Sequence, residues 1–289
     1  MIVATLMLIG AGVSWALVGV VFSRAAEKNI HPLRTVFASA LFFLLFSWTF
    51  LPRWGMIAHE TRAAELFLWM LVSGSASCAG LISLQAAMQR GTHGMSWGIA
   101  QGALAVPFAL GVLLFRDKSE PHRWLALVSI LAGIALISRA RYSATASKQS
   151  IVLACAAFIA LGIQQTAMSV PSRWAEWTDV ARLRIPFFSA AIALISGLII
   201  AIGRPAASRG AWFLGLTAAV GNLAGQVLIV QGLDRLAACG LASIAYPIAV
   251  STSMVSFILW RVIAAHERLF SLQIISLALI LAGAVFIAL

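Results

Sequence analysis

The chain has 289 residues, of which 62% are hydrophobic and only 10% charged, and it carries a formal net charge of +11. A soluble domain has about 25% charged residues, so this composition excludes a water-soluble globule, a disordered chain and a soluble disulfide scaffold. The basic residues stand in ones to threes between long apolar runs, which is typical of cations that flank membrane spans. We therefore expect an integral membrane protein whose partner is the lipid bilayer and not a nucleic acid.

Ten apolar runs follow one another along the chain, and each is about long enough to cross a bilayer as a helix. The expected spans are Ile2–Phe22, Leu33–Leu51, Leu66–Met88, Met95–Phe115, Trp124–Ser138, Ile151–Val170, Ile185–Ile202, Ala211–Gly232, Gly240–Ile263 and Phe270–Leu289. The fifth run is the shortest and is marginal in length. The predicted fold class is an all-α integral membrane protein with ten transmembrane helices.

The second half of the chain repeats polar and apolar positions of the first half. Arg34 recurs as Arg184, and Ile130–Gly133 recurs as Ile280–Gly283, about 150 positions later, which is the signature of an internal duplication. The predicted domains are a five-helix repeat at 1–139, a polar linker at 140–150 and a second five-helix repeat at 151–289. Five spans per repeat make the repeats inverted around a central cavity, an arrangement typical of secondary transporters. A duplicated scaffold is the alternative.

Charged residues are nearly absent from the interiors of these spans, and Asp and Glu are confined to loops and span ends. Proton relays and cation sites usually need ionisable groups inside the membrane. The pattern therefore disfavours a central carboxylate that exchanges protons for cationic drugs. It favours a neutral or zwitterionic solute that is held by dipoles.

Uncharged polar and aromatic side chains near the middle of the spans are the candidate substrate-binding residues. Asn222 and Gln226 share one helix face at i, i+4 spacing, and Gln164 occupies the repeat position of Trp15. Helix packing is the alternative role for such amides and small residues. The expected cavity residues are Trp15, Trp97, Gln101, Gln164, Asn222, Gln226, Tyr246 and Ser253. Pro107 and Pro247 are expected to bend the fourth and ninth spans.

No motif for catalysis, phosphate binding or metal binding stands out in the sequence. The three cysteines, Cys78, Cys155 and Cys239, and the five histidines are scattered without ligand spacing. We therefore predict no enzyme, no cofactor and no metal site. An intramembrane enzyme is the alternative, and it would need a buried acid or base within reach of its substrate.

The arginines at span ends are expected to have structural roles. Arg34 and Arg184, at the starts of the second and seventh spans, are expected to snorkel toward the membrane surface, and binding of a substrate carboxylate is the alternative. Acidic and basic residues three positions apart are expected to form local ion pairs, namely Arg24 with Glu27 and Arg173 with Glu176.

The ends of the two halves carry a family resemblance. The stretch Ala264–Gly283 has a short Glu-Arg turn before a final helix that ends in Leu-Ala-Gly, and Arg116–Gly133 is a weaker copy with Asp117 or Glu120 in place of the Glu. This pattern resembles the penultimate loop and last helix of the drug/metabolite transporter (DMT) superfamily, EamA-type branch. Within it, the chain resembles YddG-like amino-acid exporters in its length and in its largely uncharged, aromatic-containing cavity spans.

The resemblance implies a ten-helix bundle whose cavity is formed mainly by the first, third, fourth, sixth, eighth and ninth spans. It also implies peripheral fifth and tenth spans, which often mediate association, so a weak homodimer through them is expected. Members of this superfamily move amino acids, other metabolites, sugars, nucleotide sugars or drugs.

The expected function is secondary transport by alternating access, most simply export of small neutral or zwitterionic metabolites that include aromatic and apolar amino acids. A sugar or drug carrier of the same superfamily is one alternative, and a non-transporting membrane scaffold or receptor is another. The resemblance implies a bacterial-type inner membrane with both termini in the cytoplasm. Loop charges do not decide this orientation, because basic residues are nearly balanced between the two sides.

Overall fold

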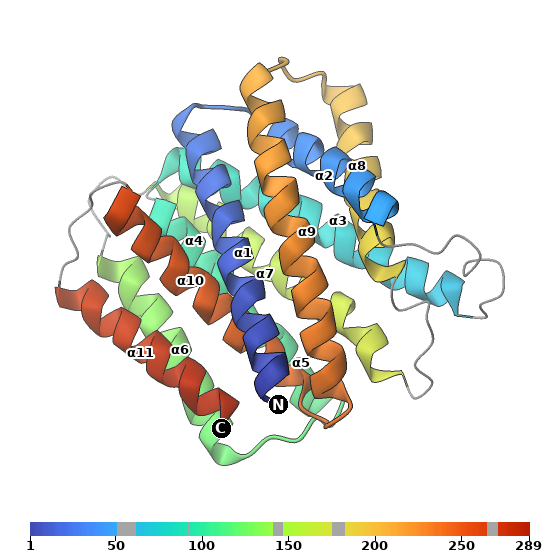
Figure 1. Cartoon of the computed structure of the whole chain (residues 1–289). Helices are drawn as coiled ribbons and strands as arrows, with labels where there is room; N and C mark the ends of the chain where they lie inside the picture. Colours follow the sequence, from blue (N-terminus) through green and yellow to red (C-terminus); the bar gives the residue numbers. More distant parts are fainter. Residues whose placement is uncertain (51–61, 92, 141–146, 175–182, 265–270) are drawn as a thin grey trace.

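The computed structural model describes residues 1–50, 62–91, 93–140, 147–174, 183–264 and 271–289, and these form a bundle of helices (Figure 1). The α-helices are α1 (Ile2–Glu27), α2 (Pro32–Phe50), α3 (Ala63–Arg90), α4 (His93–Gln101), α5 (Ala105–Leu113), α6 (Pro121–Ala140), α7 (Lys148–Ser169), α8 (Arg184–Gly203), α9 (Arg209–Ala237), α10 (Ala245–Ala264) and α11 (Ser271–Ala288). Short 3₁₀ turns are η2 (Gly102–Leu104), η3 (Val170–Arg173) and η5 (Ala242–Ile244). No strand occurs in these ranges.

Nine spans within the described residues are long and apolar enough to cross a membrane, as an integral membrane protein requires. Among them α4, η2 and α5 together form one span, His93–Leu113, in which the 3₁₀ turn η2 interrupts the α-helix. The helix α6 is apolar over a shorter stretch, Pro121–Ile137, which corresponds to the fifth and shortest run in the sequence. Large apolar side chains such as Leu125, Ile202 and Phe213 are exposed, and in a membrane these would face lipid.

Most helices extend beyond the apolar runs that predict them. The first helix continues past Phe22 to Glu27, and α7 begins at Lys148, where Ser147 accepts a hydrogen bond from the Ser150 amide at 3.1 Å. This helix cap shortens the polar linker expected at 140–150, of which residues 141–146 lie outside the described residues. Other residues used in the sequence predictions also lie outside them: Leu51, Glu176, Glu267, Arg268 and Phe270.

The helices pack in a regular pattern of neighbours. The long helix α3 lies along α7, and α1 lies along α9. The helix α2 contacts α8 and α9, while α8 also contacts α3. The helix α10 contacts α1, and the interrupted span of α4 and α5 contacts α7. Both termini lie at the same end of the bundle, which we call the terminal end (Figure 1).

The helices α6 and α11 form an antiparallel pair at one edge of the bundle (Figure 1). A Cβ atom on Gly133 would lie 2.7 Å from Ile280 Cγ1, and a Cβ atom on Gly283 would lie 2.6 Å from Ile130 Cγ1. The missing side chains let the two backbones approach closely, as small residues commonly do between membrane helices. Each helix of this pair therefore places a glycine against an isoleucine of the other helix.

Both candidate bending prolines follow a 3₁₀ turn. Pro107 lies in the first turn of α5, directly after η2 interrupts the fourth span, and Pro247 lies in the first turn of α10, after η5. A proline in the first turn of a helix removes no intrahelical hydrogen bond. Pro247 therefore marks the start of α10, which then runs without interruption to Ala264.

Candidate functional site

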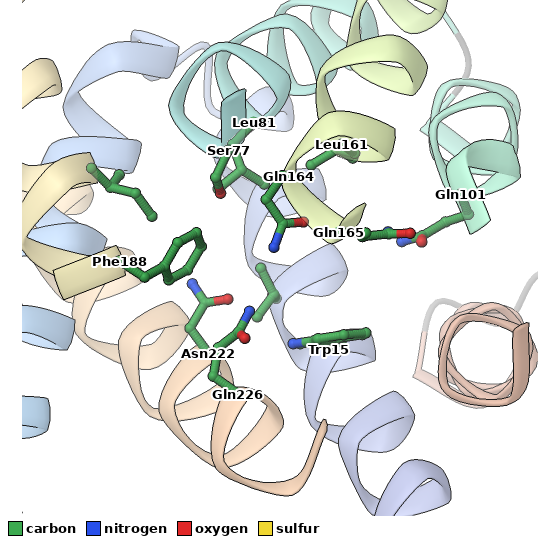
Figure 2. A pocket seen from close by; sticks show the side chains of 12 residues that line it. Trp15, Ser77, Leu81, Gln101, Leu161, Gln164, Gln165, Phe188, Asn222 and Gln226 are labelled. Atoms are coloured by element: carbon green, nitrogen blue, oxygen red, sulfur yellow. The ribbon is translucent and has the colours of Figure 1, made fainter. Parts of the chain in front are cut away.

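A cavity lies near the middle of the bundle, where six helices approach one another (Figure 2). It is partly open and has about 80 Å³ of free volume, which is room for about five to eight water molecules or a small solute. Its lining comes from α1, α3, α4, α7, α8 and α9: Trp15, Val18, Ser77, Leu81, Gln101, Leu161, Gln164, Gln165, Phe188, Ile192, Asn222 and Gln226.

One wall of the cavity is formed by α9, where Asn222 and Gln226 lie one turn apart and face inward (Figure 2). The Asn222 side-chain amide donates to Ser39 Oγ at 3.4 Å. Gln226 is buried, and its Oε1 atom has no hydrogen-bond partner among the residues that the structure describes. A buried amide oxygen without a partner is costly, so this atom is suited to accept a hydrogen bond from a bound solute.

The opposite wall is formed by α7, where consecutive residues Gln164 and Gln165 both border the cavity. The hydroxyl of Ser73 on α3 donates to the Gln164 carbonyl oxygen at 3.0 Å and holds the two helices together at this depth. The side chains of Gln165 and Gln101 point toward one another in Figure 2. Within the described part of the chain, Gln165 Oε1 also lacks a partner. The wall therefore offers a second free acceptor.

Trp15 on α1 forms the aromatic side of the cavity. Its indole packs on the bare backbone of Gly225, where a Cβ atom would lie 2.5 Å from Trp15 Nε1. On its other side it stacks on Tyr246 of α10, with ring centroids 6.2 Å apart and an interplanar angle of 8°. Gly225 thus gives the indole the space to lie between α9 and α10.

Five predicted cavity residues line the cavity together, whereas three others lie elsewhere. Those in the lining are Trp15, Gln101, Gln164, Asn222 and Gln226. Tyr246 lies behind Trp15, in the stack described above. Trp97 fills the space above Gly19 and contacts Phe257, with ring centroids 5.3 Å apart. Ser253 lies where α10 crosses α1 at Gly12.

Several lining residues are missing from the sequence prediction, and their signals differ. Phe188 and Ile192 lie one turn apart on α8, which is not among the spans expected to form most of the cavity, and such apolar pairs also occur on ordinary packing faces. Gln165 stands beside the predicted Gln164, so its polarity in mid-span was a usable signal. The other unpredicted residues in the lining are Val18, Ser77, Leu81 and Leu161.

The cavity combines apolar walls with polar amide side chains, and its lining carries no charge. Five carboxamides supply both donors and acceptors, namely Gln101, Gln164, Gln165, Asn222 and Gln226, and no ionisable side chain belongs to the lining of this cavity. A solute with a net charge would lose its hydration here without gaining a counter-charge, which is unfavourable in a membrane interior. Across the described residues no group of three His, Cys, Asp or Glu side chains is placed to hold a metal ion.

Buried ion pairs occur at the terminal end of the bundle, and one of them corrects the expected role of Arg184. The prediction that Arg184 snorkels is wrong, because its side chain is 0% exposed and donates to both carboxylate oxygens of Asp234 at 2.6 and 2.7 Å. Arg173 pairs with Asp117 at 2.6 Å. Its expected partner Glu176 lies outside the described residues. At the opposite end Glu27 contacts Arg261.

Comparison with known proteins finds a solved structure with a similar fold but no matching family. No protein-family model matches the sequence, and no curated protein matches it. A solved crystal structure, described only as that of a protein, is similar over 99% of this chain and 98% of its own, with a TM-score of 0.68 and 14% sequence identity. At this identity the similarity shows that the two chains share a fold, and nothing further.

Proposed function

We propose that the protein is a secondary transporter that moves small neutral or zwitterionic metabolites, with amino acids as the leading candidates, by alternating access to the central cavity. The observation that carries this proposal is the cavity itself, a mid-bundle site that is uncharged, combines amide side chains with apolar walls, and is lined by helices from both halves of the chain. Two free amide oxygens, on Gln165 and Gln226, would accept hydrogen bonds from a solute's N–H or O–H groups. Trp15 and Phe188 would contact its apolar part.

The contacts between helices support an inverted duplication. In it α1, α2 and α3 correspond to α7, α8 and α9, the single span of α4 and α5 corresponds to α10, and α6 corresponds to α11. Under this exchange the α3–α7 contact corresponds to α9–α1, and α2–α9 corresponds to α8–α3. The α6–α11 pair maps onto itself, and its two glycine contacts are mutual counterparts. Inverted repeats give a carrier two related conformations that open to opposite sides. This symmetry favours a carrier over a static scaffold.

Membrane placement and assembly remain parts of the same proposal. We infer a bacterial-type inner membrane with both termini in the cytoplasm, and a weak homodimer through the peripheral helices α6 and α11. Large apolar side chains on α11, such as Ile274 and Val285, are exposed and are available for lipid or for a second copy. Resemblance to the EamA-type branch of the drug/metabolite transporters supports both the membrane orientation and the homodimer.

The function is tested by a flux screen on purified protein in liposomes. The panel holds apolar and aromatic amino acids, neutral sugars and a lipophilic cation, each measured with and without a pH gradient. We expect counterflow of amino acids and no movement of the lipophilic cation, because the cavity offers no counter-charge. Movement of sugars alone would replace the amino-acid proposal with a sugar carrier, and absence of flux for every solute would favour a scaffold or receptor.

Matched variants tie any flux to the cavity. Gln164→Ala and Asn222→Ala each remove a lining amide, and we expect each to lower flux about tenfold, the effect of one lost hydrogen bond. Gln89→Ala is the control, because Gln89 donates to the Ile30 carbonyl oxygen away from the cavity. Equal flux in all three variants would remove the cavity amides from the solute path.

A further inference from the structure

The terminal end of the bundle holds a continuous network of buried charges. Arg173 donates to both oxygens of Asp117, through Nη2 at 2.6 Å and Nε at 3.3 Å. Asp117 also accepts a hydrogen bond from the Ser243 amide at 2.7 Å. Asp117 follows α5 in the first half of the chain, whereas Arg173 ends η3 and Ser243 lies in η5 of the second half. This ion pair therefore ties the two halves together.

A second ion pair continues the network. Arg184, at the start of α8, donates to Asp234 near the end of α9 and also, through Nη1, to Ser172 Oγ at 2.6 Å. Ser172 directly precedes Arg173 in η3, so one 3₁₀ turn joins both pairs. The network thus links the ends of α5, α7 and α9 with the starts of α8 and α10.

The network lies between the cavity and the terminal end. The amide of Ser243 binds Asp117, and one turn later on the same chain segment Tyr246 stacks on Trp15, which lines the cavity. The Trp15 indole lines the cavity with Tyr246 behind it. Asp234 lies about two turns beyond Gln226, toward the C-terminal end of α9, which Figure 1 shows at the terminal end. Movement of the start of α10 away from Asp117 would therefore disturb both the ion pair and the Trp15 stack.

We propose that Asp117, Arg173, Ser172, Arg184 and Asp234 form a latch that keeps the cavity closed toward the terminal end in this conformation. The proposal rests on the proposed carrier function and adds the residues that control one gate. Buried ion pairs are stable only while both partners stay together, but entry of water lets the charges separate at much lower cost. The latch is therefore stable when dry and closed, and it releases when the end opens and hydrates.

A thiol reporter in the cavity tests the latch. Cys78, Cys155 and Cys239 are replaced, and Ser77→Cys supplies the single reporter, because Ser77 lines the cavity. Vesicles of known protein orientation are treated from the terminal side with a charged thiol reagent that cannot cross the membrane. The variant Asp117→Asn/Arg173→Gln removes both charges of the pair that joins the halves, and we expect labelling from the terminal side to rise at least about tenfold.

Two further variants make the result independent of charge removal. A Cβ atom on Gly111 would lie 2.8 Å from Ser243 Cβ and 2.9 Å from Asp117 Oδ2, so Gly111→Ala forces the latch apart with all charges kept. We expect it to raise labelling as well. Arg173→Lys keeps the charge and allows one hydrogen bond to Asp117. Its rate of labelling from the terminal side should therefore lie between the rates of the wild type and the double variant.

The matched control is Glu27→Gln/Arg261→Gln, which removes the ion pair at the opposite end. It should leave labelling from the terminal side unchanged. The latch is refuted if the folded double variant and Gly111→Ala label at the wild-type rate, or if the control raises terminal-side labelling as much as they do. Labelling requires no solute, so this outcome is independent of the flux screen, which alone decides the carrier function.

Discussion

At the terminal end of the bundle, Arg173 binds the buried carboxylate of Asp117, and the fully buried Arg184 binds Asp234, whose side chain is only 14% exposed. The opposite end uses weaker partners. Arg34, the repeat counterpart of Arg184, donates to the Pro205 carbonyl oxygen at 3.1 Å. Arg261 contacts Glu27 at 3.3 Å, but the Glu27 side chain is 45% exposed, and an exposed pair contributes about 1 kcal/mol or less.

This difference between the ends shows how repeated sequence positions can acquire unequal energetics. Arg24, the counterpart of Arg173, lies over the Trp260 ring at 5.4 Å. The arginines therefore recur in both halves. Among the described residues, however, no carboxylate binds Arg24 or Arg34 as Asp117 and Asp234 bind Arg173 and Arg184. Within the part of the chain that the structure describes, the terminal end thus has the more deeply buried ion pairs.

The largest expected effect comes from Arg184→Met, which leaves the Asp234 carboxylate buried without its partner. We expect a loss of about 3–5 kcal/mol in the free energy of unfolding. Arg34→Met at the opposite end removes only the hydrogen bonds from Nε and Nη2 to one carbonyl oxygen and should cost about 1–2 kcal/mol. Thermal unfolding of both variants in detergent measures the two effects side by side.

The double variant Arg184→Met/Asp234→Leu sharpens this test. Replacing a buried pair by apolar residues of similar volume is often neutral, so most of the lost stability should return. Persistent loss in the double variant would show that Arg184 stabilises the bundle through contacts other than its ion pair.

A smaller difference is expected for the carboxylates themselves. Asp117→Asn keeps an acceptor for the Ser243 amide but leaves the Arg173 charge without a counter-charge, so it should cost about 2–3 kcal/mol. Glu27→Gln, at an exposed pair, should cost less than about 1 kcal/mol. Comparable shifts in the unfolding temperature for the two variants would contradict the inequality of the ends.

The smallest contrast is expected where the two halves meet symmetrically, between α6 and α11. Gly133→Ala and Gly283→Ala each place a methyl group within 2.7 Å of the facing helix, and overpacking of this kind costs about 1–3 kcal/mol. We expect the two costs to agree within about 0.5 kcal/mol, because the contacts are equivalent. Unequal costs, measured by thermal unfolding, would show that the symmetry of this pair is only apparent.

Much of the fold was predictable because hydropathy alone locates apolar helices of membrane length. The i, i+4 spacing of Asn222 and Gln226 also placed both on one wall of the cavity. The ion pairs were not predictable, since Asp117 and Arg173 stand 56 positions apart and Arg184 and Asp234 stand 50 apart. No local spacing reveals such partners; only the packing of α5, η3, α8 and α9 brings them together.

The central claim is that the cavity amides hold a solute and do not merely stabilise the bundle. It is tested by comparing Gln226→Leu with Gln85→Leu, since Gln226 lines the cavity and Gln85 donates to the Ile30 carbonyl oxygen at 2.8 Å. The measurement is solute flux in liposomes alongside the unfolding temperature of each variant. We predict that Gln226→Leu lowers flux about tenfold or more with an unchanged or raised unfolding temperature. For Gln85→Leu we predict a lowered unfolding temperature and an unchanged flux. Wild-type flux in Gln226→Leu would contradict the account.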